Sequence, residues 1–160
     1  MHHYKYLGTE IDANLSWKVN TNAICKKVQK RLYFLRRLRQ FNVHKDIMLT
    51  FHRTFILSVQ TSNFLCWYGA LNIQEKKQLK RLTKIASRII GHELDDLDAL
   101  YKQRVLKKAY KIMRDNHHPL VGEYTYLPSG RRLRSMNCKS KRSMNSFVAT
   151  SIRFLNDSCK

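Results

Sequence analysis

Apolar side chains recur at steps of three or four residues over most of the chain. That spacing places one face of a helix on a common stripe and predicts an amphipathic helix from Trp17 to about Phe41. Another face carries Lys26, Lys27, Lys30 and Arg37, whereas Arg31 and Arg39 fall near the edges of the stripe. The apolar stripe consists of Ile24, Val28, Leu32, Leu35 and Leu38.

The same spacing predicts three more helices downstream. The second begins near Asp46, a candidate N-cap, and continues toward Trp67; it is apolar on several faces, so we expect a central, buried helix. The third is opened by the capping-box pattern of Asn72 and Glu75 and closed by Gly91. The fourth follows a group of aspartates, which are favourable at a helix N-terminus, and ends before a His-His-Pro sequence.

The two ends of the chain differ from this helical centre. Residues 4–12 alternate loosely around Gly8 and predict a short strand or hairpin. Residues 116–142 are rich in turn-forming and basic side chains and predict a basic loop, followed by a short final helix. The predicted fold is an all-α helical bundle preceded by a short β-strand or hairpin. Its expected domains are an N-terminal strand, a helical domain and a basic tail, at residues 1–16, 17–115 and 116–160.

Charge changes the picture more than any other property of the composition. The 160 residues include 31 Lys and Arg against 11 Asp and Glu, a formal net charge of +20. A surface this basic attracts polyanions, so nucleic acid is the expected partner and an anionic membrane surface is the alternative. The excess lies at both ends: residues 1–44 carry +7, residues 45–101 carry +2 and residues 102–160 carry +11.

The cysteines and the hydropathy of the chain favour an intracellular protein, in the nucleus or cytoplasm. The four cysteines form no CxxC pair, which favours reduced thiols. Residues 54–74 carry no charge and are long enough to span a bilayer, but five polar side chains favour a buried helix instead. We therefore expect no membrane partner.

Two basic segments are candidate nucleic-acid contacts. The first predicted helix can pair with successive phosphates, and an aromatic ring within it can stack on a base; the alternative is a solvated face over an ordinary core. The loop at residues 129–134 is the second candidate and equally fits a nuclear localisation patch, which is a compatible role. The candidate residues in these segments are Lys26, Lys27, Lys30, Tyr33, Arg37, Arg131, Arg132 and Arg134, and Lys5 near the N-terminus is a further candidate.

Catalytic patterns are weak by comparison. His44 and Asp46 match the H-x-D pair of an iron(II) site, but Asp46 already has a capping role. Asp95 and Asp96 are better explained as helix-capping groups than as a two-metal pair. The sequence contains no glycine-rich phosphate loop and no zinc-finger spacing. We therefore predict no catalytic residue, no metal and no cofactor, with a residual Fe(II) enzyme as a hypothesis from another class.

The order of several short motifs resembles a known family. These motifs are Lys5-Tyr6-Leu7-Gly8-Thr9, Leu15-Ser16-Trp17, Arg31 to Leu38, Cys66-Trp67 and Pro128-Ser129-Gly130-Arg131-Arg132. Together they resemble the thumb and C-terminal tail of non-LTR (LINE, Rex/Babar-type) retrotransposon reverse transcriptases, over roughly residues 4–156. The resemblance implies a helical thumb that holds a template–primer duplex, with Lys5, Tyr6 and Gly8 at the junction to the palm.

The family's catalytic aspartates lie in the palm, and no matching motif occurs in this sequence. We therefore expect a non-catalytic fragment that binds RNA or an RNA–DNA duplex, with a missing palm domain as a further partner. An apolar patch would be exposed where that palm packed. A non-functional relic is the alternative. The region also resembles a segment classed as the N-terminal domain of an AlkB-type tRNA-modifying enzyme, whose Fe(II)/2-oxoglutarate dioxygenase or methyltransferase chemistry these residues do not support.

Overall fold

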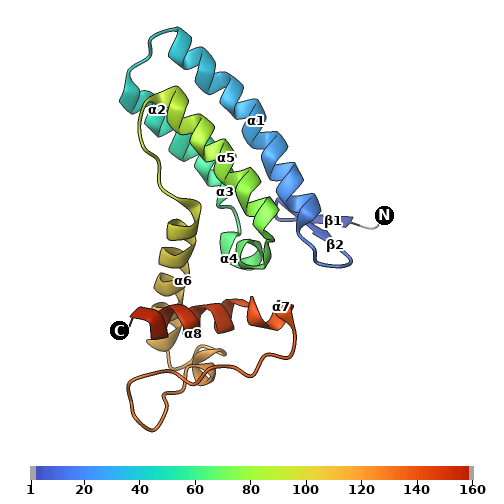
Figure 1. Cartoon of the computed structure of the whole chain (residues 1–160), viewed down its shortest axis with the longest axis vertical. Helices are drawn as coiled ribbons and strands as arrows, with labels where there is room; N and C mark the ends of the chain where they lie inside the picture. The colour runs from blue at the N-terminus through green and yellow to red at the C-terminus, as the bar shows by residue number, and fades with distance from the viewer. Residues whose placement is uncertain (1–2, 159–160) are drawn as a thin grey trace. The chain divides into compact units, whose positions relative to one another are not determined.

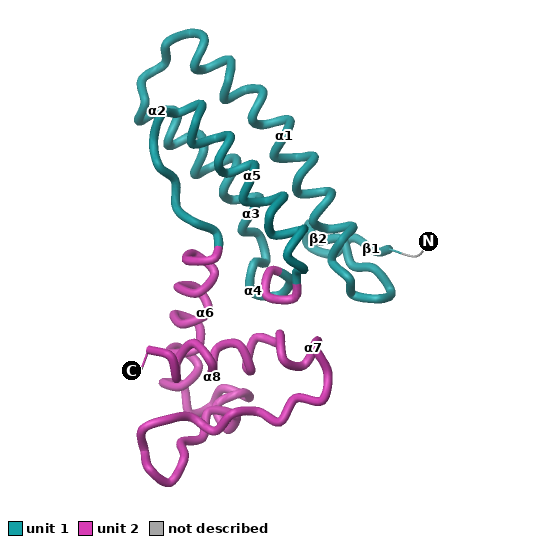
Figure 2. Tube along the Cα trace, viewed as in Figure 1, with its two compact units in different colours: residues 1–67, 71–97 teal, residues 68–70, 98–160 magenta. Residues whose placement is uncertain are grey.

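The computed structural model describes residues 3–158 and is mostly helical, with a short N-terminal hairpin (Figure 1). The predicted fold class is therefore confirmed. The chain divides into two compact units (Figure 2). The first contains the residues up to 67 together with 71–97, and the second contains residues 68–70 and those from 98 onward. Among the described residues, no helix is long and apolar enough to cross a membrane.

The N-terminal segment forms a two-stranded antiparallel hairpin of β1 (His3–Tyr6) and β2 (Thr9–Asp12). Both residues of the connecting turn have positive φ, 46° and 82°, and the second of them is Gly8. Turns of this kind match the right-handed twist of the paired strands. The side-chain amide of Asn63 donates to the Thr9 hydroxyl at 2.8 Å, which ties the hairpin to the helices of the first unit.

The first helix, α1 (Lys18–Gln40), matches the predicted segment closely. It follows Trp17, whose φ of 61° turns the chain into the helix. The predicted apolar stripe forms the buried side, although Leu38 is only half-buried. The buried members are Ile24, Val28, Leu32 and Leu35.

The second helical stretch consists of α2 (Lys45–Phe51), a π-helical turn η1 (His52–Leu57) and α3 (Ser58–Gln60). The predicted N-cap at Asp46 is wrong. His44 occupies that position, and its Nδ1 accepts the backbone N–H of Asp46 at 3.4 Å. Asp46 lies instead in the first turn, where its charge favours the helix dipole.

This stretch is not the expected central helix that is buried on several faces. Only one side is buried, and exposed aromatic and aliphatic side chains lie on another. The helix also ends earlier than predicted, because the chain turns at 61–63 with a φ of 49° at Asn63. A separate short helix, α4 (Phe64–Trp67), follows. The buried side chains of the stretch are Met48, His52, Ile56 and Gln60.

The next helix, α5 (Ile73–Ile90), confirms both predicted end signals. Asn72 Oδ1 accepts from the Glu75 N–H at 2.8 Å, and Glu75 Oε2 accepts from the Asn72 N–H at 2.9 Å. Gly91 closes the helix with a φ of 69°, a conformation that glycine adopts without strain. The buried side of α5 packs along α1, and these two helices form the main packing contact of the first unit.

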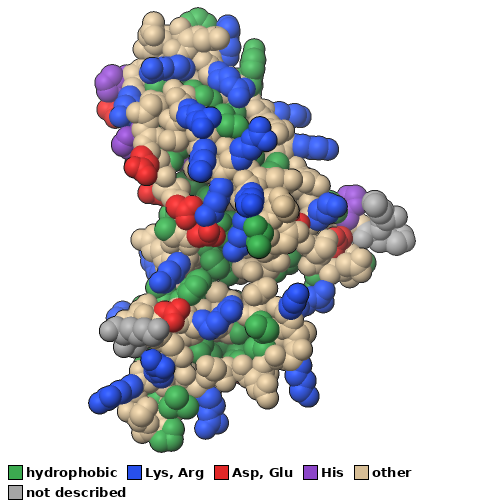
Figure 3. Space-filling model, viewed as in Figure 1, with side chains coloured by type: hydrophobic (Ala, Val, Ile, Leu, Met, Phe, Trp, Pro, Cys, Tyr) green, Lys and Arg blue, Asp and Glu red, His purple; other side chains and the backbone are tan. Residues whose placement is uncertain are grey.

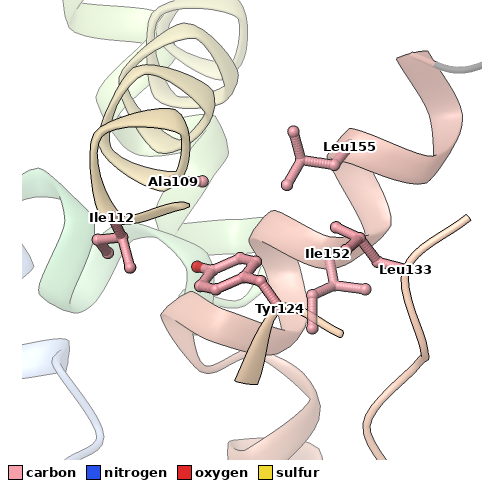
Figure 4. Close-up of a cluster of buried hydrophobic side chains, with 6 residues drawn as sticks. All are labelled: Ala109, Ile112, Tyr124, Leu133, Ile152 and Leu155. Atoms are coloured by element: carbon pink, nitrogen blue, oxygen red, sulfur yellow. The ribbon is translucent and has the colours of Figure 1, made fainter. Parts of the chain in front are cut away.

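The second unit is organised by α6 (Leu97–Met113) and α8 (Phe147–Ser158). Shorter elements complete it: η2 (Tyr68–Ala70), η3 (Val121–Glu123) and α7 (Lys141–Met144). Its core joins residues far apart in sequence (Figure 4), namely Ala109, Ile112, Tyr124, Leu133, Ile152 and Leu155. Most of α6 belongs to this second unit, together with the C-terminal segment (Figure 2). The predicted domains had grouped α6 with the preceding helices instead.

Candidate nucleic-acid interface

The outer side of α1 carries a basic stripe. Lys26, Lys30, Tyr33 and Arg37 follow one another at steps of four, three and four residues, so they share one face opposite the buried stripe. All four side chains are exposed. At a rise of 1.5 Å per residue, the stripe extends over about 16 Å of helix axis. Lys27 is exposed as well but lies about 100° around the helix, on the flank of this stripe.

A second basic stripe, on α5, was not predicted from the sequence. Lys77, Arg81, Lys84 and Arg88 repeat the same four-three-four spacing and are all exposed. The net charge of the middle of the chain does not reveal this stripe, because the acidic residues at 93–98 cancel much of its positive charge. The spacing itself was the signal that could have revealed it.

Carboxylates are scarce on both helices. The α1 sequence contains no Asp or Glu at all. In α5 the only acidic residue is Glu75, which is buried in the capping box. Nearby, Asp96 pairs with Lys80 at 3.1 Å, and Lys80 belongs to neither stripe. The two stripes therefore keep their positive charge without acidic neighbours on their own helices.

A groove of about 570 Å³ lies between α1 and α5 in the first unit. Lys26, Arg36 and Arg81 reach it from the two helices, and none of the described residues that line it is acidic. Burial raises the pKa of the Cys25 thiol in the groove wall, which keeps that group uncharged. Figure 3 shows many Lys and Arg side chains over the helices of this unit. The groove can accept an extended anion with cations on both of its sides.

Lys5 is exposed on β1, also in the first unit, but it does not line the groove. The register of the hairpin places Lys5 directly opposite Glu10. The Glu10 carboxylate lies 3.9 Å from the Nε2 atom of His3 on the same strand as Lys5. Lys5 therefore stays a candidate contact that lies apart from the groove.

The predicted basic loop of the second unit is an ordered hairpin-like turn. Gly130 N–H donates to the Leu127 carbonyl at 2.8 Å, with Pro128 and a glycine at positions that such turns favour. Asn156 of α8 holds the returning strand, since it exchanges hydrogen bonds with the N–H and C=O of Leu133 at 2.9 and 3.1 Å. The loop is thus fixed on its own unit and presents the exposed side chains of Arg131, Arg132 and Arg134.

The weak catalytic patterns gain no support. His44 Nδ1 and Asp46 Oδ2 lie 3.4 Å apart, but both side chains are exposed and the imidazole caps α2. Within residues 3–158, no group of three or more His, Cys, Asp and Glu side chains is placed to hold a metal ion. Cys25, Cys66 and Cys138 are free thiols, and Cys159 lies outside the described residues.

A known family matches part of the first unit. The family described as alkylated DNA repair protein alkB homolog 8, N-terminal, matches residues 17–58. The matched segment contains α1, α2, η1 and the first residue of α3, and thus carries the first basic stripe but not the second. No curated protein and no solved structure is significantly similar to the chain.

Proposed function

We propose that this chain binds nucleic acid through the phosphate backbone along the groove between α1 and α5. The observation that carries the proposal is a groove between two helices that each carry a basic stripe. Lys26 and Arg81 of these stripes line the groove, together with Arg36. Lys and Arg side chains on a helix neutralise successive phosphates and release the counterions condensed on the nucleic acid. Binding of this kind is independent of base sequence and weakens steeply with salt.

The resemblance to a reverse transcriptase thumb suggests which nucleic acid and which partner the chain binds. On that reading the chain is a non-catalytic fragment whose substrate is a template–primer duplex of RNA and DNA, and a palm domain is an additional partner. Nucleic acid as partner implies a location in the nucleus or cytoplasm. No catalytic residue, metal or cofactor enters this proposal, and the dioxygenase and methyltransferase chemistries remain without supporting residues. If the chain is a relic, the same surface persists without a selected role.

Charge reversal tests the proposal directly. The binding of a fluorescently labelled RNA–DNA duplex is measured by anisotropy for the wild type, for K26E/K30E on α1 and for R81E/R88E on α5. Each pair loses two phosphate contacts and gains repulsion, so we expect affinity to fall at least about tenfold. The matched control is K107E/K108E on α6 of the second unit, which changes the net charge equally at two exposed lysines.

The control separates a local surface from bulk charge. We expect K107E/K108E to bind within about threefold of the wild type, because long-range contributions of single charges are screened at physiological salt. Equal losses for all three variants would mean that net charge alone attracts the duplex. Unchanged affinity in both stripe variants would refute the proposed interface.

A further inference from the structure

A group of apolar side chains is exposed along the seam between α1 and the α2–η1 stretch. We name Phe34, Phe41, Ile47, Phe51 and Phe55 the aromatic seam. Phe34, Phe41, Ile47 and Phe55 expose 57%, 69%, 58% and 51% of their surface, and Phe51 is half-buried. Four of the five are phenylalanines. Soluble domains rarely leave such a group uncovered unless it is an interaction site.

The members of the aromatic seam lie on two segments that pair with each other. The chain reverses at 41–44, so α2 and η1 run back along α1, and both pack against it. The Arg31 guanidinium of α1 donates to the backbone carbonyl of Phe55 and fixes the pairing. Later residues of α1 therefore lie beside earlier residues of α2. The rings of Phe51 and Phe55 are in contact, with 4.9 Å between their centres.

Cations accompany the rings. Lys27, Lys30 and Arg37 are exposed on the same part of α1, which carries no acidic residue. The Arg37 guanidinium lies over the Phe41 ring, 5.1 Å from its centre. A ligand of the aromatic seam must therefore offer flat apolar surfaces and negative charge at short intervals.

We propose that the aromatic seam binds single-stranded nucleic acid, with unpaired bases stacked on its rings and phosphates on the flanking cations. This deepens the proposed function and rests on it, because Lys30 and Arg37 also belong to the α1 stripe. Proteins that bind single strands combine a basic track with aromatic side chains on which successive bases stack. A duplex satisfies only half of this surface, since its bases are already stacked inside the helix and its phosphates face outward.

Charge argues against two other occupants. A second copy of the chain would bring another +20 charge against the same cations. An apolar protein surface would cover the rings but would leave Lys27 and Lys30 desolvated without counter-charges, which is costly. Single-stranded nucleic acid supplies the flat apolar groups and the anions in one molecule.

The test uses the full chain and a single-stranded oligodeoxynucleotide that contains 2-aminopurine, whose fluorescence reports base stacking. Truncation of the exposed rings in F34A/F41A removes stacking surface and no charge. We expect affinity for the single strand to fall at least about fivefold, the lower limit for one stacked base. The fluorescence change on binding should shrink while the salt dependence stays the same. The control Y110A truncates an exposed ring of α6 and should leave all three readouts unchanged.

The outcomes separate this inference from the proposed function. If K26E/K30E weakens duplex binding but F34A/F41A binds the single strand like the wild type, the phosphate interface stands and the aromatic seam is not a base-stacking site. If neither variant has an effect, both proposals fail. If F34A/F41A changes only self-association in sedimentation, the seam is a protein-contact surface and this inference is wrong. The variant F34L/F41L, which keeps apolar side chains, replaces F34A/F41A if circular dichroism shows lost helix.

Discussion

His52 offers a test of the packing in the first unit. It lies at the start of η1 and exposes only 2% of its surface. Neither ring nitrogen has a hydrogen-bond partner among the described residues. Burial lowers the pKa of this imidazole from its ordinary value; the positive charge of Arg53 lowers it further, and Asp95 partly offsets both. The folded protein therefore holds a neutral, unsatisfied imidazole.

The cost of that imidazole can be stated from its surroundings. A buried polar group without a partner destabilises a protein by about 1–3 kcal/mol. Replacement of His52 by leucine, an apolar residue of similar size with good helix propensity, removes that cost. We expect His52→Leu to raise the free energy of unfolding at pH 7.5 by about 1–3 kcal/mol.

The pH dependence gives a second signature with a definite sign. Because the pKa of His52 is lower in the folded state, the unfolded chain takes up a proton that the folded chain excludes. Stability is therefore present above the ordinary histidine pKa of about 6.5 and is lost as pH falls below it. One such group contributes at most about 1.4 kcal/mol per pH unit over that range. In His52→Leu this contribution disappears.

Urea denaturation at pH 7.5, 6.0 and 5.0 measures both effects, with folding followed by circular dichroism. The difference in stability between His52→Leu and the wild type should widen as the pH falls, since the other histidines are common to both proteins. A variant that is less stable at pH 7.5 by more than about 1 kcal/mol would mean that the imidazole forms a stabilising hydrogen bond. A constant difference across the three pH values would refute the lowered pKa.

Two further substitutions test the local devices that hold the fold. Asn72→Ala removes one half of the capping box of α5, and urea denaturation should show an unfolding free energy lower by about 0.5–2 kcal/mol. The control Gln74→Ala, on the same exposed first turn, should change the unfolding free energy little. No loss in Asn72→Ala would show that the cap is not formed. Asn156→Ala releases the N–H and C=O of Leu133 and should speed hydrogen exchange of the Leu133 amide by at least about fivefold, while helical amides of α6 keep their protection. Unchanged exchange at Leu133 would contradict the anchoring of the basic loop.

Local signals carried most of the fold prediction. The apolar stripe of α1, the capping box at Asn72 and the glycine at position 91 each act over a few residues, so they are readable before any tertiary contact is known. The N-cap at position 46 failed because a histidine two residues earlier supplies an acceptor that capping preferences rank low. The expected continuous helix toward Trp67 is wrong because the chain turns at 61–63, with a positive φ at Asn63. The Asn63 amide also bonds to Thr9 of the hairpin, a tertiary contact that local sequence patterns do not show.

The candidate site was predicted only in part. The α1 stripe was visible because its cations stand in a segment without acidic residues. The α5 stripe was missed because the acidic residues that follow it lower the net charge counted over the middle of the chain. The groove that Lys26 and Arg81 line exists only because α5 packs beside α1. The aromatic seam depends on the antiparallel pairing of α1 with α2, so no single segment of the sequence reveals it.

The most direct test of the proposed interface is the salt dependence of RNA–DNA duplex binding by the wild-type chain. Each neutralised phosphate contributes a slope of about −0.9 to log Kobs against log[KCl]. With four cations on α5 and three on α1 along the two stripes, we predict a slope steeper than about −3 between 50 and 300 mM KCl, made shallower by about two in K26E/K30E. A slope near zero, or the same slope in K26E/K30E as in the wild type, would contradict binding through these phosphate contacts.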